Sequence, residues 1–390
     1  MSDVLEPFDG LTLRRWPRLK QERLRAWDGA DRYLLRTLDE AIAGPGADPA
    51  AGEGTLVVND QCGALWLAAA KRGPAWSSGD SWLSRQAALR NGQDNQVPLR
   101  EADWLWPDQR PALMPARVLM RIPKELSLLE FQLAELSGWL PEGTPVWLAG
   151  MDKHLPPSLL ALMQQWLGNG RADLGWKKAH RFFATAPGQA LLPAPEPAVI
   201  PVPGQRWTLI ARAGVFGRRH LDIGARFLLA HLPSGVTGEV ADLGCGNGVL
   251  GLALAASNPQ ARVTFCDESW SAVASARENA EMLAVADGSD HEFHLGNGLD
   301  GLDRQFDLVL LNPPFHRGHA VDDQVARTLL RHAARHLSAD GEVRIVANRH
   351  LDYRHPLERL FAQMEVLASN AKFVIYRCTR SKVKRAQAAD

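Results

Sequence analysis

The run Leu311-Asn312-Pro313-Pro314-Phe315, which ends the apolar segment 306–311, has side chains suited to methylation of an aromatic amine. Such an amine is a weak nucleophile because its lone pair is delocalised into the ring. The Asn312 side-chain oxygen and the Pro313 carbonyl would accept its two hydrogens and direct the lone pair at a methyl group. Phe315 offers a face on which the target base stacks. We expect Asn312, Pro313 and Phe315 to be catalytic; the structural alternative is a proline-kinked loop with a core phenylalanine.

A glycine-rich turn precedes a helical pattern and follows Asp242, at the end of an apolar strand. Glycines allow a sharp turn and a close ligand, and the helix N-terminus offers free amides. An aspartate before GxGxG is typical of S-adenosylmethionine (SAM) sites rather than of the GxGxxG dinucleotide turn, although a tight turn without a ligand is the alternative. The predicted SAM-binding residues of this turn are Asp242, Gly244, Gly246, Asn247 and Gly248.

Two further polar residues end strands of the same half. Asp267 lies about 20 residues past the glycines, where a carboxylate accepts both ribose hydroxyls of a nucleoside. It could instead cap the next helix, as could Glu268 or Ser269. Asn297 has an amide suited to the adenine edge, and a simple turn role fits it equally well. We expect Asp267 and Asn297 to complete the SAM site.

Four histidines have an approximate finger-like spacing: His316, His319, His332 and His336. The first pair falls in the substrate loop and the second on one helix, and neither has a cysteine partner. Solvated histidines are therefore expected, with no metal site.

The elements that must position these residues alternate between short apolar runs and helical patterns, which predicts a doubly wound parallel α/β sheet. Strands are expected at 239–243, 262–266, 292–295, 307–311, 342–347 and 373–377, and helices at 249–256, 271–283 and 323–337.

The first half repeats this pattern weakly. Residues 57–63 match 240–246, and residues 118–124 match 309–315, so that Asn59 falls on Asp242 and Arg121 on Asn312. These matches predict two tandem Rossmann-like methyltransferase domains, the N-terminal one degenerate and without a SAM site.

Prolines crowd the region between the halves, where they hold a chain extended. The expected organisation is a degenerate domain at 1–186, a Pro-rich linker at 187–203, a catalytic SAM-dependent methyltransferase domain at 204–378 and a basic tail at 379–390.

The first half holds most of the 13 tryptophans and a basic run at 176–181. Aromatic faces beside cations suit unpaired RNA, although most of these tryptophans are expected in the core. The candidate RNA-binding residues are Lys177, Lys178, Arg181, Arg121 and Lys124.

Composition restricts the protein class. The 390 residues are 46% hydrophobic and carry 44 basic and 44 acidic side chains, so the whole chain is neither disordered nor globally basic. The four cysteines form no CxxC pair, which argues against a disulfide framework and a thiolate zinc site. With neither a secretory signal nor an apolar run long enough to cross a bilayer, a cytoplasmic protein without membrane contact is expected.

The chain resembles the duplicated-domain bacterial rRNA guanine-N2 methyltransferases over nearly its whole length. The resemblance rests on the opening 11–17, on Gly214-Val215-Phe216, on 221–227, on the glycine turn, on 312–316 and on 346–353. Gly217 departs from the serine that is usual after Val-Phe. The opening and the run 348–353 are more similar to the large-subunit enzymes.

This resemblance implies SAM as the cofactor, ribosomal RNA as the partner and methylation of a guanine N2 in 23S rRNA. The same reaction on 16S rRNA is an alternative. A glutamine-N5 protein methyltransferase shares the Asn-Pro-Pro-aromatic run but has a small helical domain before its catalytic domain. A non-catalytic RNA-binding protein would leave Asp242, Asp267 and Asn312 unexplained.

Overall fold

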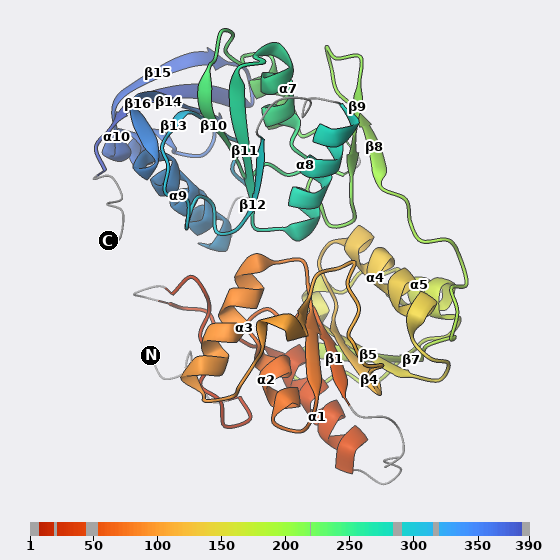
Figure 1. Ribbon diagram of the computed structural model, residues 1–390. Coiled ribbons are helices and arrows are strands. Elements are labelled where there is room, and N and C mark those ends of the chain that lie inside the picture. The colour runs from red at the N-terminus through yellow and green to blue at the C-terminus, as the bar shows by residue number, and fades with distance from the viewer. Residues whose placement is uncertain are drawn as a thin grey trace. The chain divides into compact units, whose positions relative to one another are not determined.

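The computed structural model describes residues 8–18, 22–43, 54–218, 220–283, 291–314 and 320–383. The chain divides into two compact units, Met1–Glu196 and Pro197–Asp390. Each unit has a seven-stranded, mostly parallel sheet with helices on both faces (Figure 1). The predicted fold class is confirmed. No helix in the described ranges is long and apolar enough to cross a membrane.

The first unit contains α1 (Gly29–Ala43), β1 (Thr55–Val58), α2 (Ala64–Ala70), β2 (Ala75–Ser78), α3 (Trp82–Asp94), β3 (Trp104–Leu105), β4 (Arg117–Arg121), α4 (Leu126–Trp139), β5 (Pro145–Met151), α5 (Leu159–Leu167), β6 (Arg171–Ala172) and β7 (Ala179–Thr185). The second contains β8 (Ala198–Pro201), β9 (Thr208–Ala211), α6 (Ile223–Leu229), β10 (Gly238–Leu243), α7 (Val249–Ser257), β11 (Ala261–Asp267), α8 (Trp270–Met282), β12 (Glu292–Leu295), β13 (Phe306–Leu311), α9 (Ala320–Arg335), β14 (Leu337–Asn348), α10 (Arg354–Leu360), β15 (Phe361–Ser369) and β16 (Phe373–Ser381).

The two main sheets have the same topology. The strand order is β3-β2-β1-β4-β5-β7-β6 in the first and β12-β11-β10-β13-β14-β16-β15 in the second, and the sixth strand in each order is antiparallel to the fifth. After β1 the chain turns toward one face of the sheet, and after β4 it turns toward the other face. The same is true of β10 and β13 in the second sheet. Loops that follow such a pair of strands diverge and leave a crevice, where ligands of doubly wound proteins bind.

At the glycine turn, the alignment of the two units in the structure is shifted by two residues from the alignment predicted from the sequence. Gly63 and Gly248 each immediately precede a helix, with the same φ of 83°. Val58 pairs with Met120 of β4 as Leu243 pairs with Leu311 of β13. Val57 therefore corresponds to Asp242, and the predicted match of Asn59 with Asp242 was wrong. The sequence match was based on the Cys-Gly pair that both units contain, whereas the structural alignment of the units follows from where the strands end.

Both faces of each sheet are buried, which explains the nearly continuous apolar strands. In the first unit, Val57 and Leu119 pack against α1 and α2, and Val118 packs against α4 and α5. In the second, Leu310 packs beneath α6, α7 and α8, and Leu311 lies on the face covered by α9 and α10. The strand ends are thus fixed by packing on both sides.

The predicted linker is too long and the predicted tail begins too early. β8 pairs with β9, and Ile200 and Val202 are buried in the core of the second unit. Such an edge strand tolerates a proline because no hydrogen bond of the sheet requires a backbone N–H at that position. Residues 379–381 continue β16, which pairs with β15. Residues 384–390 lie outside the described ranges.

Candidate active site

The glycine turn joins β10 to α7 at the carboxyl edge of the second sheet. Gly244, Gly246 and Gly248 all have positive φ values, of 75°, 54° and 83°. A Cβ added to Gly244 or Gly246 would meet no described atom within 4 Å, whereas one on Gly248 would lie 3.0 Å from Ala276. Gly248 therefore allows close helix packing, and the other two leave open space against the backbone. A ligand can approach there.

Asp242 lies beneath this turn and is only 1% exposed. Its Oδ2 accepts a hydrogen bond from the Gly251 amide at 2.8 Å, which ties α7 to the strand. Burial raises the pKa of this carboxyl to about 7. A contact between Asp242 and the methionine part of SAM remains a prediction, because the observed contact of this carboxylate is with the helix.

Asp267 connects the turn to the neighbouring strand. Its Oδ2 accepts from the Gly246 amide and its Oδ1 from the Ser269 amide, both at 3.0 Å. Ser269 itself caps α8 by accepting from the Ala272 amide at 3.1 Å. The capping alternative for Asp267 is therefore wrong. The ribose contact of Asp267 stays a prediction.

Asn312 follows β13, so it emerges beside the residue that follows β10. Its Nδ2 donates to Asp222 Oδ2 at 3.0 Å. Its Oδ1 is buried and has no hydrogen-bond partner among the described residues. Pro313 is buried as well. Phe315 lies outside the described residues, so its stacking role is still a prediction.

Asp222 was missing from the sequence-based site. It caps α6, accepting from the Ala225 amide at 2.8 Å through the oxygen that also receives Asn312. The signal in the sequence is an aspartate directly before a helical pattern, which predicts a cap and not a contact with a strand end 90 residues away.

The remaining predicted SAM residues have structural contacts of their own. Asn297 donates through Nδ2 to Asp300 Oδ2 at 2.7 Å, as expected for a turn asparagine. Asn247 is 7% exposed, and its carbonyl accepts from Asn279 at 2.9 Å. An adenine contact by Asn297 remains a prediction.

The described histidines within and directly after α9 have protein partners. His332 lies 3.3 Å from Asp300, and His336 lies 3.2 Å from the Arg304 carbonyl. Burial lowers the pKa of His332. No group of three metal-ligating side chains occurs within the described ranges. His316 and His319 fall outside them.

The first unit has other residues at the positions of this site. Val57 corresponds to Asp242, and Arg121 to Asn312, because Met120 and Leu311 have the same register. Gly79 corresponds to Asp267, since Val58 pairs with Ser78 as Leu243 pairs with Cys266.

In the first unit, the amides at the N-terminus of α2 already bind a side chain of the protein. The buried Asp60 accepts from the amides of Gly63, Ala64 and Trp66 at 3.0, 3.1 and 2.8 Å. These amides are therefore unavailable to an external ligand.

Arg121 is not an RNA contact, contrary to the sequence-based prediction. It is 8% exposed, and its guanidinium lies 2.5 Å from Asp28 and 3.3 Å from Asp31. Burial alone would lower its pKa, but these carboxylates outweigh that effect and raise it. The sequence pattern gave no sign that two acidic residues before and within α1 would enclose this cation.

The other predicted RNA contacts differ in availability. Lys177 and Lys178 are exposed at the tip of the turn before β7, and Lys124 is exposed after β4. Arg181 instead pairs with Asp173 at 2.7 Å and Glu40 at 3.2 Å. The three lysines remain candidate RNA contacts, whereas the Arg181 guanidinium is engaged in ion pairs within the first unit.

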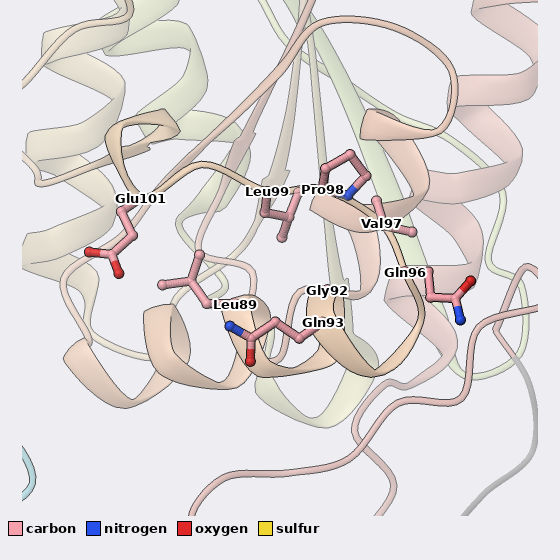
Figure 2. A pocket seen from close by; sticks show the side chains of 8 residues that line it. All are labelled: Leu89, Gly92, Gln93, Gln96, Val97, Pro98, Leu99 and Glu101. Carbon is pink, nitrogen blue, oxygen red and sulfur yellow. The ribbon is translucent and has the colours of Figure 1, made fainter.

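A cavity of about 370 Å³ lies in the first unit, formed by the end of α3 and the segment after it. Figure 2 shows the side chains that line this cavity. Glu101 is the only ionisable residue among the eight that line it, and none belongs to the predicted site. It therefore has no part in the chemistry described above.

The RLMG N-terminal domain matches residues 1–188, and the methyltransferase small domain matches residues 206–377. The ribosomal RNA large subunit methyltransferase G of Alcanivorax borkumensis is 52% identical over 384 residues, which cover 97% of both chains. The present chain belongs to the large subunit methyltransferase G family.

A second member of the methyltransferase G family, from Erwinia tasmaniensis, is 43% identical over 95% of this chain and 97% of its own. The fold is similar to that of the T. thermophilus 16S rRNA N2 methyltransferase RsmC, solved with AdoMet and guanosine. That structure covers 96% of this chain and 97% of its own with a TM-score of 0.73 at 23% identity. The chain is thus a methyltransferase with the duplicated fold.

Proposed function

We propose that this protein transfers a methyl group from SAM to the exocyclic N2 amine of a guanine in 23S rRNA. The observation that carries the proposal is the Asn312 carboxamide oxygen, which is buried without a partner in the described part of the site. It emerges beside the glycine turn, since Leu243 and Leu311 are paired at the ends of adjacent strands. An acceptor in that position suits an amine hydrogen.

The residues around the turn fit SAM. Open space over Gly244 and Gly246 admits a ligand against the backbone. The Asp267 carboxylate, at the end of β11, is the proposed acceptor for the ribose hydroxyls. Asn297 is the candidate for the adenine edge, and Asn247 and Gly248 complete the turn. When bound, SAM supplies an electrophilic methyl group on a sulfonium.

The protein groups at this site would activate the amine as hydrogen-bond acceptors rather than as a strong base. Asn312 Oδ1 and the Pro313 carbonyl accept the two amine hydrogens, so the nitrogen lone pair turns out of the ring plane. The proline after Asn312 contributes no amide that would compete for these oxygens. Phe315 would stack on the base once it has left its helix.

The substrate class is supported by the named relatives, whose family acts on the large ribosomal subunit RNA. The fold relative named for 16S rRNA is less similar in sequence. We assign the protein to the cytoplasm, where rRNA is made and where its four free, buried cysteines stay reduced. Lys177, Lys178 and Lys124 in the first domain are the proposed RNA contacts.

The test is incubation of the protein with labelled SAM and, separately, with 23S rRNA, 16S rRNA and each subunit from cells that lack the modification. Digestion and mass spectrometry then identify the labelled nucleotide. N2-methylguanine in 23S rRNA is expected. Label in 16S rRNA alone would assign the small-subunit reaction, and label in protein alone would exclude both RNA substrates.

A further inference from the structure

The hydrogen bond between Asn312 and Asp222 fixes which end of the carboxamide faces the site. A carboxamide has a donating NH₂ end and an accepting oxygen end, and rotation by half a turn exchanges them. An ionised carboxylate only accepts, so Asp222 must receive the Nδ2 end, as it does at 3.0 Å. The oxygen end then points away from Asp222, and it is the atom left buried without a described partner.

Asp222 is itself held independently of Asn312. Its Oδ2 accepts from the Ala225 amide at 2.8 Å in the first turn of α6. Ala225 and Leu228 of that helix are buried in the core of the second unit. The fold therefore holds this carboxylate through contacts that do not involve Asn312.

The first unit repeats this contact with a different partner. Asp28 immediately precedes α1 and accepts from the Ala30 amide at 2.9 Å. It binds Arg121, which stands where Asn312 stands in the second unit. A carboxylate at the helix start thus meets the strand end in both copies. In the first copy its partner has only donors, so no acceptor is presented beyond it.

We propose that Asp222 is a positioning residue for methyl transfer, which holds the Asn312 carboxamide with Oδ1 toward the target amine. This inference rests on the proposed function. With the amide reversed, an NH₂ group would face the amine hydrogens, and two donors would oppose each other. Asp222 excludes that rotamer because its carboxylate has no hydrogen to donate to Oδ1.

The test uses Asp222→Asn and Asp222→Ser in the full-length protein. Both substitutes accept the Ala225 amide and keep the helix cap, but neither forces the Asn312 orientation. The single-turnover rate on rRNA at saturating SAM is expected to fall about 10- to 100-fold, as for a misplaced reacting group. SAM affinity, the KM for rRNA and the melting temperature should stay close to parental values.

Two outcomes would overturn the proposal: a parental rate in either variant, or a rate that falls only in proportion to SAM affinity or melting temperature. Asp28→Asn is the matched control from the first unit, and it should keep the parental rate at a temperature where it is folded. A parent protein that methylates no rRNA would refute the proposed function instead, so the two failures are distinguishable.

Discussion

Asp60 and Asp242 accept a hydrogen bond from equivalent helical amides in the two units, but from different positions. The third residue of the helix after the first strand is Trp66 in one unit and Gly251 in the other, and each amide donates at 2.8 Å. Asp60 lies in the loop itself, whereas Asp242 lies in the strand beneath the loop. The second unit therefore keeps open space above its turn. In the first unit, the Asp60 carboxylate occupies the equivalent helix N-terminus.

One SAM molecule is expected to bind per chain. Gly246→Val should abolish that binding, because the side chain enters the open space over the turn. Gly143→Val is the matched control, since Gly143 also has a positive φ and a free Cβ direction but lies in a first-unit turn. Isothermal titration measures both. Two equivalents per chain, or unchanged binding to Gly246→Val, would contradict the assignment.

Asp267→Ala should weaken SAM affinity about 10- to 100-fold, because hydrogen bonds to a charged group contribute about 1.5–3 kcal/mol. It also removes the acceptor of the Gly246 amide, so the turn loses a support. Glu268→Ala serves as a neighbouring control. Equal dissociation constants for Asp267→Ala and the parent would argue against a ribose contact.

Asn312→Ala should lower the single-turnover methylation rate at least about 100-fold and leave SAM affinity nearly unchanged. Its oxygen contacts the amine and stabilises the transition state, not the bound cofactor. Rapid-quench assays with rRNA, alongside titration with SAM, separate the two effects. If the variant kept the parental rate, Asn312 would have no role as the amine acceptor.

Asp242 should make stability fall as pH rises. Burial raises its pKa from 3.8 to about 7, so the folded state holds a proton that the unfolded state has lost. The stabilising effect of that proton is complete below pH 3.8 and is lost as pH rises toward 7. Asp242→Asn keeps an acceptor for Gly251 and does not titrate.

The melting temperature of Asp242→Asn should therefore exceed that of the parent by a margin that grows between about pH 4 and pH 7 and is constant above. Differential scanning fluorimetry across that range measures the margin. A margin independent of pH would show that this carboxyl titrates normally in the folded protein.

The sequence predicted what depends on local pattern. The apolar strands, the glycine turn and Asn312 follow from residue types and their order along the chain. The predictions failed where a partner comes from far away. Asp222 and Arg121 meet their partners only after the helix before the first strand packs on the sheet. β15 was missed because it lies at a sheet edge with most of its side chains exposed, and its apolar and polar residues do not alternate regularly along the strand.

The RNA role of the first unit can be tested with lysines at one turn. Lys177 and Lys178 are exposed and have positive φ values of 50° and 61°, which asparagine tolerates. Lys177→Asn with Lys178→Asn should weaken rRNA binding and reduce the slope of log affinity against log salt by about two, if both side chains touch phosphates. The melting temperature should hardly change, because exposed charges contribute little to stability.

Arg181→Ala should have the opposite signature. Its guanidinium is half-buried and bridges Asp173 to Glu40 of α1. Its removal leaves Asp173 without this cation, whereas Glu40 keeps its ion pair with Arg36 at 2.8 Å. The melting temperature is expected to fall, while the salt dependence of rRNA binding keeps its slope. Filter binding between 50 and 200 mM salt, roughly the range where counterion release is visible, tests both variants. A double lysine variant with parental affinity and slope would restrict this face of the first unit to a structural role.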